Sequence, residues 1–398
     1  MRIGNREIGI NHPPYIIAEI GVNHDGDVER ALSLSDAAAE AGADAIKLQF
    51  FETDRLMSKA AKLAAYQKNA GETDPIEMLR RLELTIDEMA RVVERAHSKN
   101  IHAIVTVFSN ELVPIAETLP WDAYKTASPD IINYPLIEAL IETGKPLIVS
   151  TGASTTLDVQ EVFHDLMEPI SERCALMQCV SCYPTKREDA SIAKIRKLDD
   201  EILWLGGALG YSDHTDEIDI GALAITMGAS ILEKHFTYDR SAKGPDHSAS
   251  LEPKAMKEYI RLARSAPRAE AMDAEIVEDL KEADPKLISS DVAFGKLEAK
   301  CVLECEKNVQ EVARQSLVAI RDIKAGEFFT LEMLTTKRPG TGVMPKELKY
   351  ILGQPALRDI SADVPILVHD DVDLAYSIDE YPNSSKLNIF QRVLSLFN

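Results

Sequence analysis

The chain has 398 residues, of which 45% are hydrophobic and 27% charged, and its formal net charge at pH 7 is −21. This length exceeds what one ordinary hydrophobic core accommodates, so we expect a globular protein of two domains. The negative charge argues against a nucleic acid or an anionic membrane as a partner, because either would require a basic face. An anionic small substrate is not excluded, since a pocket can be locally basic.

Signals for export and for disulfides are weak. Residues 1–11 carry no apolar signal region, and no run approaches the ~18 apolar residues of a membrane span, so we expect a cytoplasmic protein. Cys179 and Cys182 have the spacing of a redox or zinc half-site, but the chain has no second CxxC pair. We interpret all five cysteines as buried or incidental thiols. They are Cys174, Cys179, Cys182, Cys301 and Cys305.

Residues 15–232 contain eight short apolar, β-prone runs, and helix-like stretches with a 3.6-residue period separate most of them. This alternation predicts a parallel sheet, and eight repeats predict an α/β fold of the (β/α)8 TIM-barrel type. The alternative is a doubly wound open sheet, but no glycine-rich dinucleotide fingerprint follows the first run. The expected strands are Tyr15–Ile20, Ala45–Phe50, His102–Val107, Ala123–Ala127, Leu147–Ser150, Ala175–Val180, Ile202–Leu209 and Ala229–Leu232.

The stretches between the strands carry signals for helix ends. Thr85 and Glu88 have capping-box spacing, and Gly42, Gly144 and Gly228 stand where helices are expected to stop. The expected helices are Asp27–Ala41, Thr85–Lys99, Asn133–Glu142 and Asp216–Met227.

The segment Phe51–Leu84 is long for a loop between a strand and the following helix. It contains Tyr66, Arg80 and Arg81. We expect either a lid over a site or a plain insertion.

Polar residues stand at the ends of nearly all the expected strands, where a barrel enzyme assembles its active site. One such residue is usually a cap or a solvent contact, but polar residues at successive strand ends indicate a site. They are Glu19, Lys47, Gln49, Thr106, Lys125, Ser128, Ser150, Ser181, Tyr183, Ser212, His214, Glu233 and His235.

Two histidines belong to the last two strand ends. Residues i and i+2 of a strand share a face, so Ser212 and His214 are expected to point the same way, as are Glu233 and His235. Two imidazoles with carboxylates nearby and no thiolate suit a divalent metal such as Mn, Mg or Fe, which would polarise a carbonyl oxygen. The alternative is a pair of structural histidines with ordinary hydrogen-bond partners.

Lys47 and Lys125 lie inside apolar strands, where a lysine is costly unless it is paired or functional. One interpretation is a salt bridge to a barrel carboxylate. The other is a cradle for phosphate and carboxylate groups, in which serines assist the lysines. These serines are Ser128, Ser150, Ser181 and Ser212. Glu19, at the end of the first strand, is a candidate acid/base group.

The pattern changes beyond residue 265. We expect a TIM-barrel domain over residues 1–265, a charged linker over 266–307, a small turn-rich β domain over 308–370 and a tail over 371–398. The tail ends in an amphipathic piece, Leu387–Phe397, with the pattern of a helix.

Several ordered motifs resemble the N-acetylneuraminate (sialic acid) synthase family, over nearly the whole chain to about Asp371. In the barrel they are residues 16–26 (IIAEIGVNHDG), 46–49 (IKLQ), 124–128 (YKTAS), 183–185 (YPT), 211–215 (YSDHT), 233–235 (EKH) and 244–247 (GPDH). Residues 313–317 (ARQSL) and 337–342 (KRPGTG) resemble a type III antifreeze-like (SAF) domain. The resemblance therefore implies a TIM barrel followed by a small, β-rich SAF domain.

The same resemblance implies a condensation of phosphoenolpyruvate with an open-chain N-acetylated hexose, typically N-acetylmannosamine, to give phosphate and a nine-carbon 2-keto acid. It implies that His214 and His235 bind a divalent metal, with Glu233 close to it. Manganese is the commonest metal, and magnesium or cobalt are the alternatives. Glu19 would be the acid/base group.

The family pattern also assigns the substrate contacts. Arg314 matches an arginine that reaches into the partner subunit's barrel, which implies a domain-swapped homodimer. The residues that match sugar contacts are Gln49, Tyr183 and Asp246. The residues that match phosphoenolpyruvate contacts are Lys47, Lys125, Ser128, Ser150, Ser181 and Ser212.

The sugar and the reaction have alternatives. Val180, Cys182 and Gln315 depart from common family forms on the sugar side, and residues 244–253 also resemble legionaminate-type synthases. The alternative sugar therefore has a 2,4-diacetamido-6-deoxy pattern. A metal-dependent aldolase or lyase would use the same histidines without a phosphate cradle, and a non-catalytic sugar-binding protein would need neither.

Overall fold

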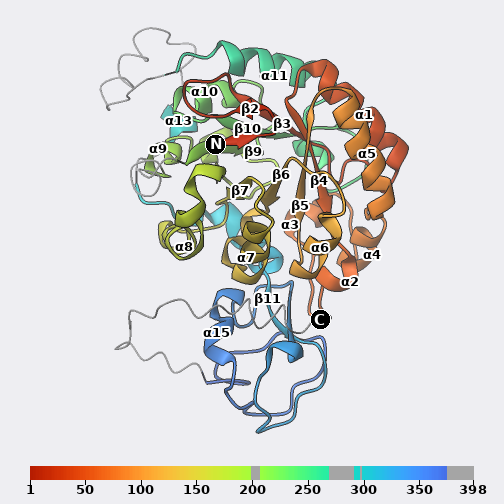
Figure 1. The fold of residues 1–398 in the computed structure, drawn as a ribbon, viewed down its shortest axis with the longest axis vertical. Coiled ribbons are helices and arrows are strands. Elements are labelled where there is room, and N and C mark those ends of the chain that lie inside the picture. Colours follow the sequence, from red (N-terminus) through yellow and green to blue (C-terminus); the bar gives the residue numbers. More distant parts are fainter. Residues whose placement is uncertain (199–206, 269–290, 296–297, 374–398) are drawn as a thin grey trace.

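The computed structural model describes residues 1–198, 207–268, 291–295 and 298–373. Its larger part is a closed barrel of eight parallel strands in chain order, and the last strand pairs with the first (Figure 1). The predicted (β/α)8 barrel is confirmed, and the open-sheet alternative is wrong. The strands are β3 (Tyr15–Glu19), β4 (Ala45–Phe50), β5 (His102–Val107), β6 (Ala123–Thr126), β7 (Leu147–Ser150), β8 (Cys174–Cys179), β9 (Ala208–Asp213) and β10 (Ile231–His235).

The seventh barrel strand was predicted too early in the chain. The predicted run was Ile202–Leu209, but β9 begins at Ala208, and residues 199–206 lie outside the described part. Ser212 therefore lies within a strand instead of following one. The last strand is displaced in the same direction, so that Glu233 and His235 also belong to β10 itself.

The interior of the barrel changes from apolar to polar along the strands. One end is filled by an apolar cluster in which Ile3 and Ile8, from the N-terminal segment, pack against inward residues of the strands. That segment forms a short hairpin, β1 (Arg2–Ile3) and β2 (Arg6–Glu7), which we did not predict. The strand residues in the cluster are Tyr15, Ile17, Ala45, Ile104, Ala123, Ile148, Ala175, Met177, Ala208 and Ile231. Because this end is filled, a pocket has room only at the C-terminal ends of the strands.

Helices surround the barrel (Figure 1). The Asp27 side chain caps the first long helix, α1, and the predicted capping box of Thr85 and Glu88 starts α5. The helix predicted over Asp216–Met227 begins later than expected: α10 starts at Ile220. The helices around the strands are α1 (Val28–Ala41), α5 (Ile86–Ser98), α6 (Val113–Ala116), α7 (Tyr134–Glu142), α8 (Thr156–Val162), α9 (Lys194–Leu198), α10 (Ile220–Thr226) and α11 (Pro253–Ser265).

The long insertion after β4 forms three short helices, α2 (Thr53–Leu56), α3 (Ala65–Asn69) and α4 (Pro75–Arg80). Its inner side is an apolar cluster over the C-terminal end of the barrel. We call this cluster the apolar wall; it consists of Val22, Phe51, Leu56, Met57, Leu63, Met78, Leu79, Leu82 and Phe108. Arg80 and Arg81 instead pair with acidic residues of the insertion itself.

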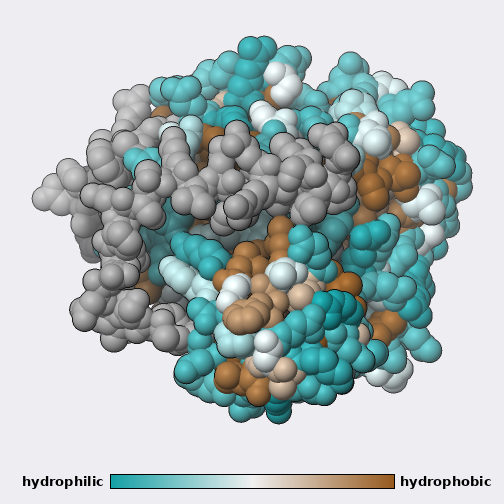
Figure 2. All heavy atoms as spheres, turned by 60° about the horizontal axis from the view of Figure 1, so that its bottom comes forward, coloured by the Kyte–Doolittle hydropathy of each residue, from teal (hydrophilic) through white to brown (hydrophobic). Residues whose placement is uncertain are grey.

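The C-terminal part has a separate core and packs against the open end of the barrel. Ser58 donates a backbone hydrogen bond to the carbonyl of Arg338 (3.0 Å), and the Gln315 side chain donates to the carbonyl of Phe108 (2.8 Å). Figure 2 brings this end forward and shows a mainly hydrophilic surface interrupted by apolar patches. Its elements are α14 (Lys307–Ala313), β11 (Ser316–Ala319), β12 (Leu334–Lys337) and α15 (Leu348–Ile351). The preceding helix α13 (Asp291–Phe294) instead packs in the core of the barrel, where Ala193 N donates to the carbonyl of Phe294 (2.9 Å).

Parts of two predicted regions lie outside the described residues. These are residues 269–290 and 296–297 of the linker and residues 374–398, which include the expected tail helix Leu387–Phe397. Among the described helices, none has the length and apolar character needed to cross a membrane.

Candidate active site

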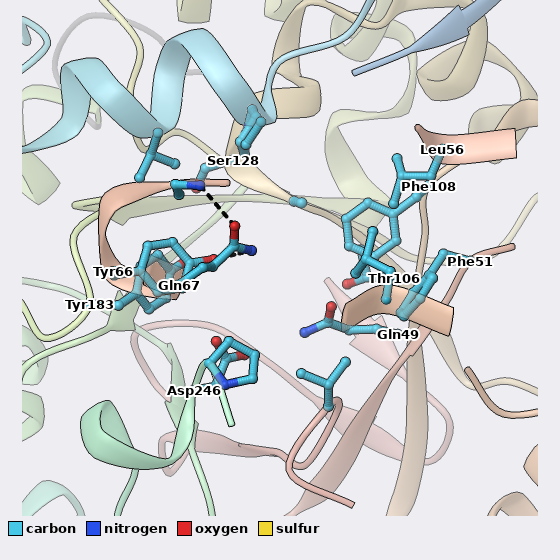
Figure 3. Close-up of a pocket in the computed structure, with 18 of the residues that line it drawn as sticks. Gln49, Phe51, Leu56, Tyr66, Gln67, Thr106, Phe108, Ser128, Tyr183 and Asp246 are labelled. Atoms are coloured by element: carbon cyan, nitrogen blue, oxygen red, sulfur yellow. Dashed lines mark hydrogen bonds between the residues drawn. The ribbon is translucent and has the colours of Figure 1, made fainter. Parts of the chain in front are cut away.

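The polar ends of the strands surround one pocket, which the insertion and the C-terminal part enclose from outside (Figure 3). Glu19 and Ser181 lie behind the lining, both buried. Arg314 does not line the pocket. The predicted site residues that do line it are Lys47, Gln49, Lys125, Ser128, Ser150, Tyr183, Ser212, His214, Glu233, His235 and Asp246.

The salt-bridge interpretation of the buried lysines is confirmed, and the anion cradle stays a prediction. Lys47 forms an ion pair with Glu19, lies 3.8 Å from Glu233 and donates to Thr106 Oγ1 at 3.0 Å. Lys125 lies 3.5 Å from Glu233. The two lysines are therefore paired with barrel carboxylates, and they also converge on the pocket lining, where an anion would meet them.

Burial and neighbouring charges shift the pKa values of the buried carboxyls and lysines at this site. Burial raises the pKa of Glu19 to about 7 against the opposing effect of Lys47. Burial lowers the pKa of Lys125 although Glu233 opposes it. For Glu233, burial is outweighed by Lys125 and Lys47, so its pKa falls. Glu19 is thus the carboxyl of this group that can exchange a proton near neutral pH.

Hydroxyl groups complete the predicted cradle. Lys125 donates to Ser150 Oγ at 2.6 Å. A Cβ atom added to Gly152 would lie 2.3 Å from Ser181 Oγ and 2.7 Å from Ser128 Oγ, so these two hydroxyls flank the same backbone. The Ser181 Oγ is buried without a hydrogen-bond partner. A buried hydroxyl without a partner suits a site that binds phosphate or carboxylate oxygens.

The two histidines face each other, with ring centroids 5.3 Å apart. His214 Nδ1 donates to the carbonyl of Val180 (2.7 Å), and its Nε2 lies 3.3 Å from Ser212 Oγ. His235 Nδ1 is buried without a hydrogen-bond partner, 3.6 Å from Asp246 Oδ2, and burial lowers the pKa of this imidazole well below its usual value. Two imidazoles that meet at one pocket fit a divalent metal, which would replace the proton that Cys179 and the Val180 carbonyl favour on His214.

The protein would supply only part of a coordination sphere. Within the described ranges, no group of three or more His, Cys, Asp or Glu side chains is arranged to hold a metal ion. Water and substrate oxygens would have to complete it, as in catalytic sites that keep open positions.

The expected sugar side contains polar and apolar groups. Gln49 donates to the carbonyl of Gly21 (3.0 Å), and the Tyr183 ring stacks on His214 with centroids 4.2 Å apart. Burial raises the pKa of Asp246 to about 6. Most of the apolar wall also lines this pocket (Figure 3).

The C-terminal part brings a different arginine to the pocket. Arg338 lines it, with the guanidinium 5.3 Å from the centroid of the Phe108 ring and with a buried Nε that has no hydrogen-bond partner. Arg314 instead donates to the carbonyl of Ala153 (3.0 Å) and to Asp158 (3.2 Å).

Thr106, one of the predicted polar strand ends, lines the pocket and lies on the inward face with Lys47. Sequence reasoning missed Cys179, which is buried behind the pocket lining. Cys179 lies 3.4 Å from Ser128 Oγ and 3.7 Å from His214 Nδ1. The two-residue period from Met177 inside the barrel to Ser181 would have predicted an inward Cys179.

Comparisons with known proteins agree with this geometry. The N,N'-diacetyllegionaminic acid synthase of Legionella pneumophila is 34% identical over 89% of this chain and 93% of its own length. The N-acetylneuraminate-9-phosphate synthase of Mus musculus is 30% identical, over 91% and 94%. The crystal structure of a spore coat polysaccharide biosynthesis protein from Bacillus subtilis superposes with a TM-score of 0.76 and 28% identity, over 94% of this chain and 99% of that one. Residues 314–370 match the SAF domain, and residues 34–274, more than half of the chain, match the NeuB family. The chain therefore belongs to the NeuB family and carries a SAF domain.

Proposed function

We propose that this protein is a nonulosonic acid synthase that condenses phosphoenolpyruvate with an open-chain N-acetylated hexose. The observation that carries the proposal is a lysine and serine cradle beside two imidazoles in one buried pocket. The cradle suits the phosphate and carboxylate of phosphoenolpyruvate. The relatives named as synthases of legionaminic acid and of N-acetylneuraminate 9-phosphate support the reaction class.

In the proposed reaction, carbon 3 of phosphoenolpyruvate forms a bond to the aldehyde carbon of the sugar. The aldehyde oxygen takes a proton, water adds to carbon 2, and the bond from carbon 2 to the phosphate oxygen breaks. The products are phosphate and a 2-keto acid. Lys47 and Lys125 would hold the anionic reactant and the leaving phosphate. Glu19 lies behind Lys47, so we assign it proton exchange through this ion pair.

We further propose that His214 and His235 hold a divalent metal, manganese before magnesium or cobalt. Such a metal would act as a Lewis acid on the sugar carbonyl. Glu233, between the two lysines and Ser212, would keep the charge of the site balanced. The support is the pair of imidazoles that meet at one pocket, one of which, His235, has a buried nitrogen without a hydrogen-bond partner.

As the sugar we propose a 2,4-diacetamido-6-deoxy hexose before N-acetylmannosamine, which reverses the order expected from the sequence. The apolar wall faces the sugar side, and it would contact the C6 methyl group and the acetamido methyl groups of such a sugar. N-acetylmannosamine stays the second candidate, because Gln49, Tyr183 and Asp246 suit hydroxyl groups. A C6 phosphate would meet mainly apolar side chains on this wall.

A domain-swapped homodimer is part of the proposal. The C-terminal part contacts the barrel through Ser58 and Phe108, and a partner's C-terminal part would be able to make the same contacts. Light scattering of the purified protein tests the dimer. A monomer at micromolar concentration would contradict it.

The test of the reaction is a phosphate-release assay with phosphoenolpyruvate, Mn²⁺ and three sugars, with mass spectrometry of the product. The sugars are the 2,4-diacetamido-6-deoxy-mannose, N-acetylmannosamine and its 6-phosphate. We expect phosphate release and a nine-carbon acid, fastest with the diacetamido sugar. An aldolase would form a product without consuming phosphoenolpyruvate. A sugar-binding protein would release no phosphate, and unchanged turnover in His214→Ala or His235→Ala would refute the metal site.

A further inference from the structure

Three polar side chains form a stripe on the helix that leads into the C-terminal domain. Glu306, Gln310 and Arg314 are spaced four residues apart, at the start, middle and end of α14, so they share one helix face. All three bind the same residue of the barrel. Glu306 Oε1 accepts from Ala153 N (2.7 Å), and Gln310 and Arg314 each donate to Ala153 O (3.0 Å each). Both backbone polar groups of Ala153 are therefore held from the C-terminal side.

Ala153 is a residue that needs such support. It is fully buried in the loop between β7 and α8, and its φ of 51° lies in the left-handed region that a non-glycine residue rarely adopts. Its neighbour Gly152 packs against the hydroxyls of Ser128 and Ser181, with no room for a Cβ atom. The position of this loop therefore decides where two hydroxyls of the anion cradle lie.

The same carboxylate also reaches the next strand of the barrel. Glu306 Oε1 accepts from Ser181 N at 2.8 Å, and Oε2 accepts from Leu303 N at 2.9 Å. Glu306 is 1% exposed, so these bonds are formed away from water. One buried carboxylate thus joins the loop after β7 to the backbone after β8.

We propose that the Glu306, Gln310 and Arg314 stripe is a positioning clamp that holds the loop around Ala153 and so couples docking of the C-terminal domain to phosphoenolpyruvate affinity. The clamp touches no reacting atom; it acts through Ser128 and Ser181. The inference depends on the proposed function for the identity of the anion. It also gives Arg314 a role that differs from the substrate contact in a partner's barrel expected from the sequence.

The experiment compares Glu306→Ala and Glu306→Gln with Glu304→Ala in the full-length protein. Glu304 is a matched control, because it lies on the same segment but is exposed and pairs with Lys307, of that segment, at the surface. Calorimetry measures the Kd of phosphoenolpyruvate, and steady-state kinetics measures KM for each substrate and kcat. Circular dichroism checks that each variant is folded.

For Glu306→Ala we expect the Kd and KM of phosphoenolpyruvate to rise by at least about tenfold, since a charged acceptor loses three hydrogen bonds, two of them from the barrel. The KM of the sugar should change less than about twofold, because its side of the pocket is not clamped. Glu306→Gln should recover part of the affinity, since its amide oxygen can still accept from Ala153 and Ser181. Glu304→Ala should match the wild type.

A folded Glu306→Ala variant with the wild-type Kd, or equal rises in both KM values, would overturn the clamp. If Glu306→Ala does not fold, Gln310→Ala decides the question. This substitution removes one of two donors to Ala153 O, and it should raise the Kd and KM of phosphoenolpyruvate without raising the KM of the sugar. A wild-type protein that binds no phosphoenolpyruvate would refute the proposed function instead, so the two failures are distinguishable.

Discussion

A buried carboxyl group between the barrel and the C-terminal domain should make the stability of this protein depend on pH. Asp130 is fully buried; its Oδ1 accepts from Gln315 at 3.2 Å, and its Oδ2 has no hydrogen-bond partner. Burial raises its pKa from 3.8 to about 7, although Arg338 and Gln315 oppose the rise. The folded chain therefore binds more protons at this site than the unfolded chain between about pH 4 and pH 7. Stability contributed by this group is lost as the pH rises through that window.

Asp130→Asn removes the titration while its amide oxygen can still accept from Gln315. With about 1.4 kcal/mol for each pH unit between the two pKa values, the variant should be more stable than the wild type by about 2 kcal/mol at pH 5.5 and about 4 kcal/mol at pH 8.5. Urea unfolding followed by fluorescence, with the slopes compared, measures this difference. The contributions of other titrating groups cancel in the difference in unfolding free energy, because both proteins share those groups. The reasoning would be refuted if the stability difference between Asp130→Asn and the wild type did not grow with pH, or if the variant were less stable than the wild type at pH 8.5.

Three further predictions concern the site. Lys125→Met should lower kcat/KM for phosphoenolpyruvate by about 10²- to 10³-fold, measured by phosphate release, because it removes a buried cation from the cradle; a loss below tenfold would remove Lys125 from the anion site. His235→Ala should abolish stimulation by added Mn²⁺ while the thermal unfolding temperature without metal stays near that of the wild type; retained stimulation would contradict metal binding there. Gly152→Ala should raise the phosphoenolpyruvate KM far more than the sugar KM, because the new Cβ would displace the hydroxyl 2.3 Å away. Equal effects on both constants would mean that the backbone adapts without moving the cradle.

The barrel was predictable because its outer face is mostly apolar and its strands are short and regularly spaced. β4, β5 and β7 have the expected bounds. The seventh strand was misplaced because Ile202–Leu209 is the more apolar run, whereas β9 carries Gly210, Ser212 and Asp213. Ser212 is buried because it belongs to the site, and Asp213 is buried because it pairs with Lys234 on the outer face of the strands. A strand that supplies functional groups is the one that propensity describes least well.

The site residues that lie on barrel strands were predictable, because alternate residues of a strand point to the same face. A two-residue period places Lys47 and Gln49 on one inward face, and likewise Glu233 and His235, whatever the loops do. Residues outside the strands do not have this constraint. Ser181 and Asp246 reach their places through loops whose path depends on contacts formed elsewhere, such as the bond from Glu306 to Ser181 N.

The two arginines of the C-terminal domain show where sequence reasoning ends. Arg314 and Arg338 both follow family motifs, and nothing local distinguishes which guanidinium enters the pocket. The choice is made by docking: Arg314 ends α14 on the face that meets Ala153 and Asp158, whereas Arg338 ends β12 beside the insertion, where its backbone pairs with Met57. The interface between the two parts therefore determines which arginine lines the pocket. Variants that loosen the Glu306 clamp should change phosphoenolpyruvate affinity although both arginines are unchanged.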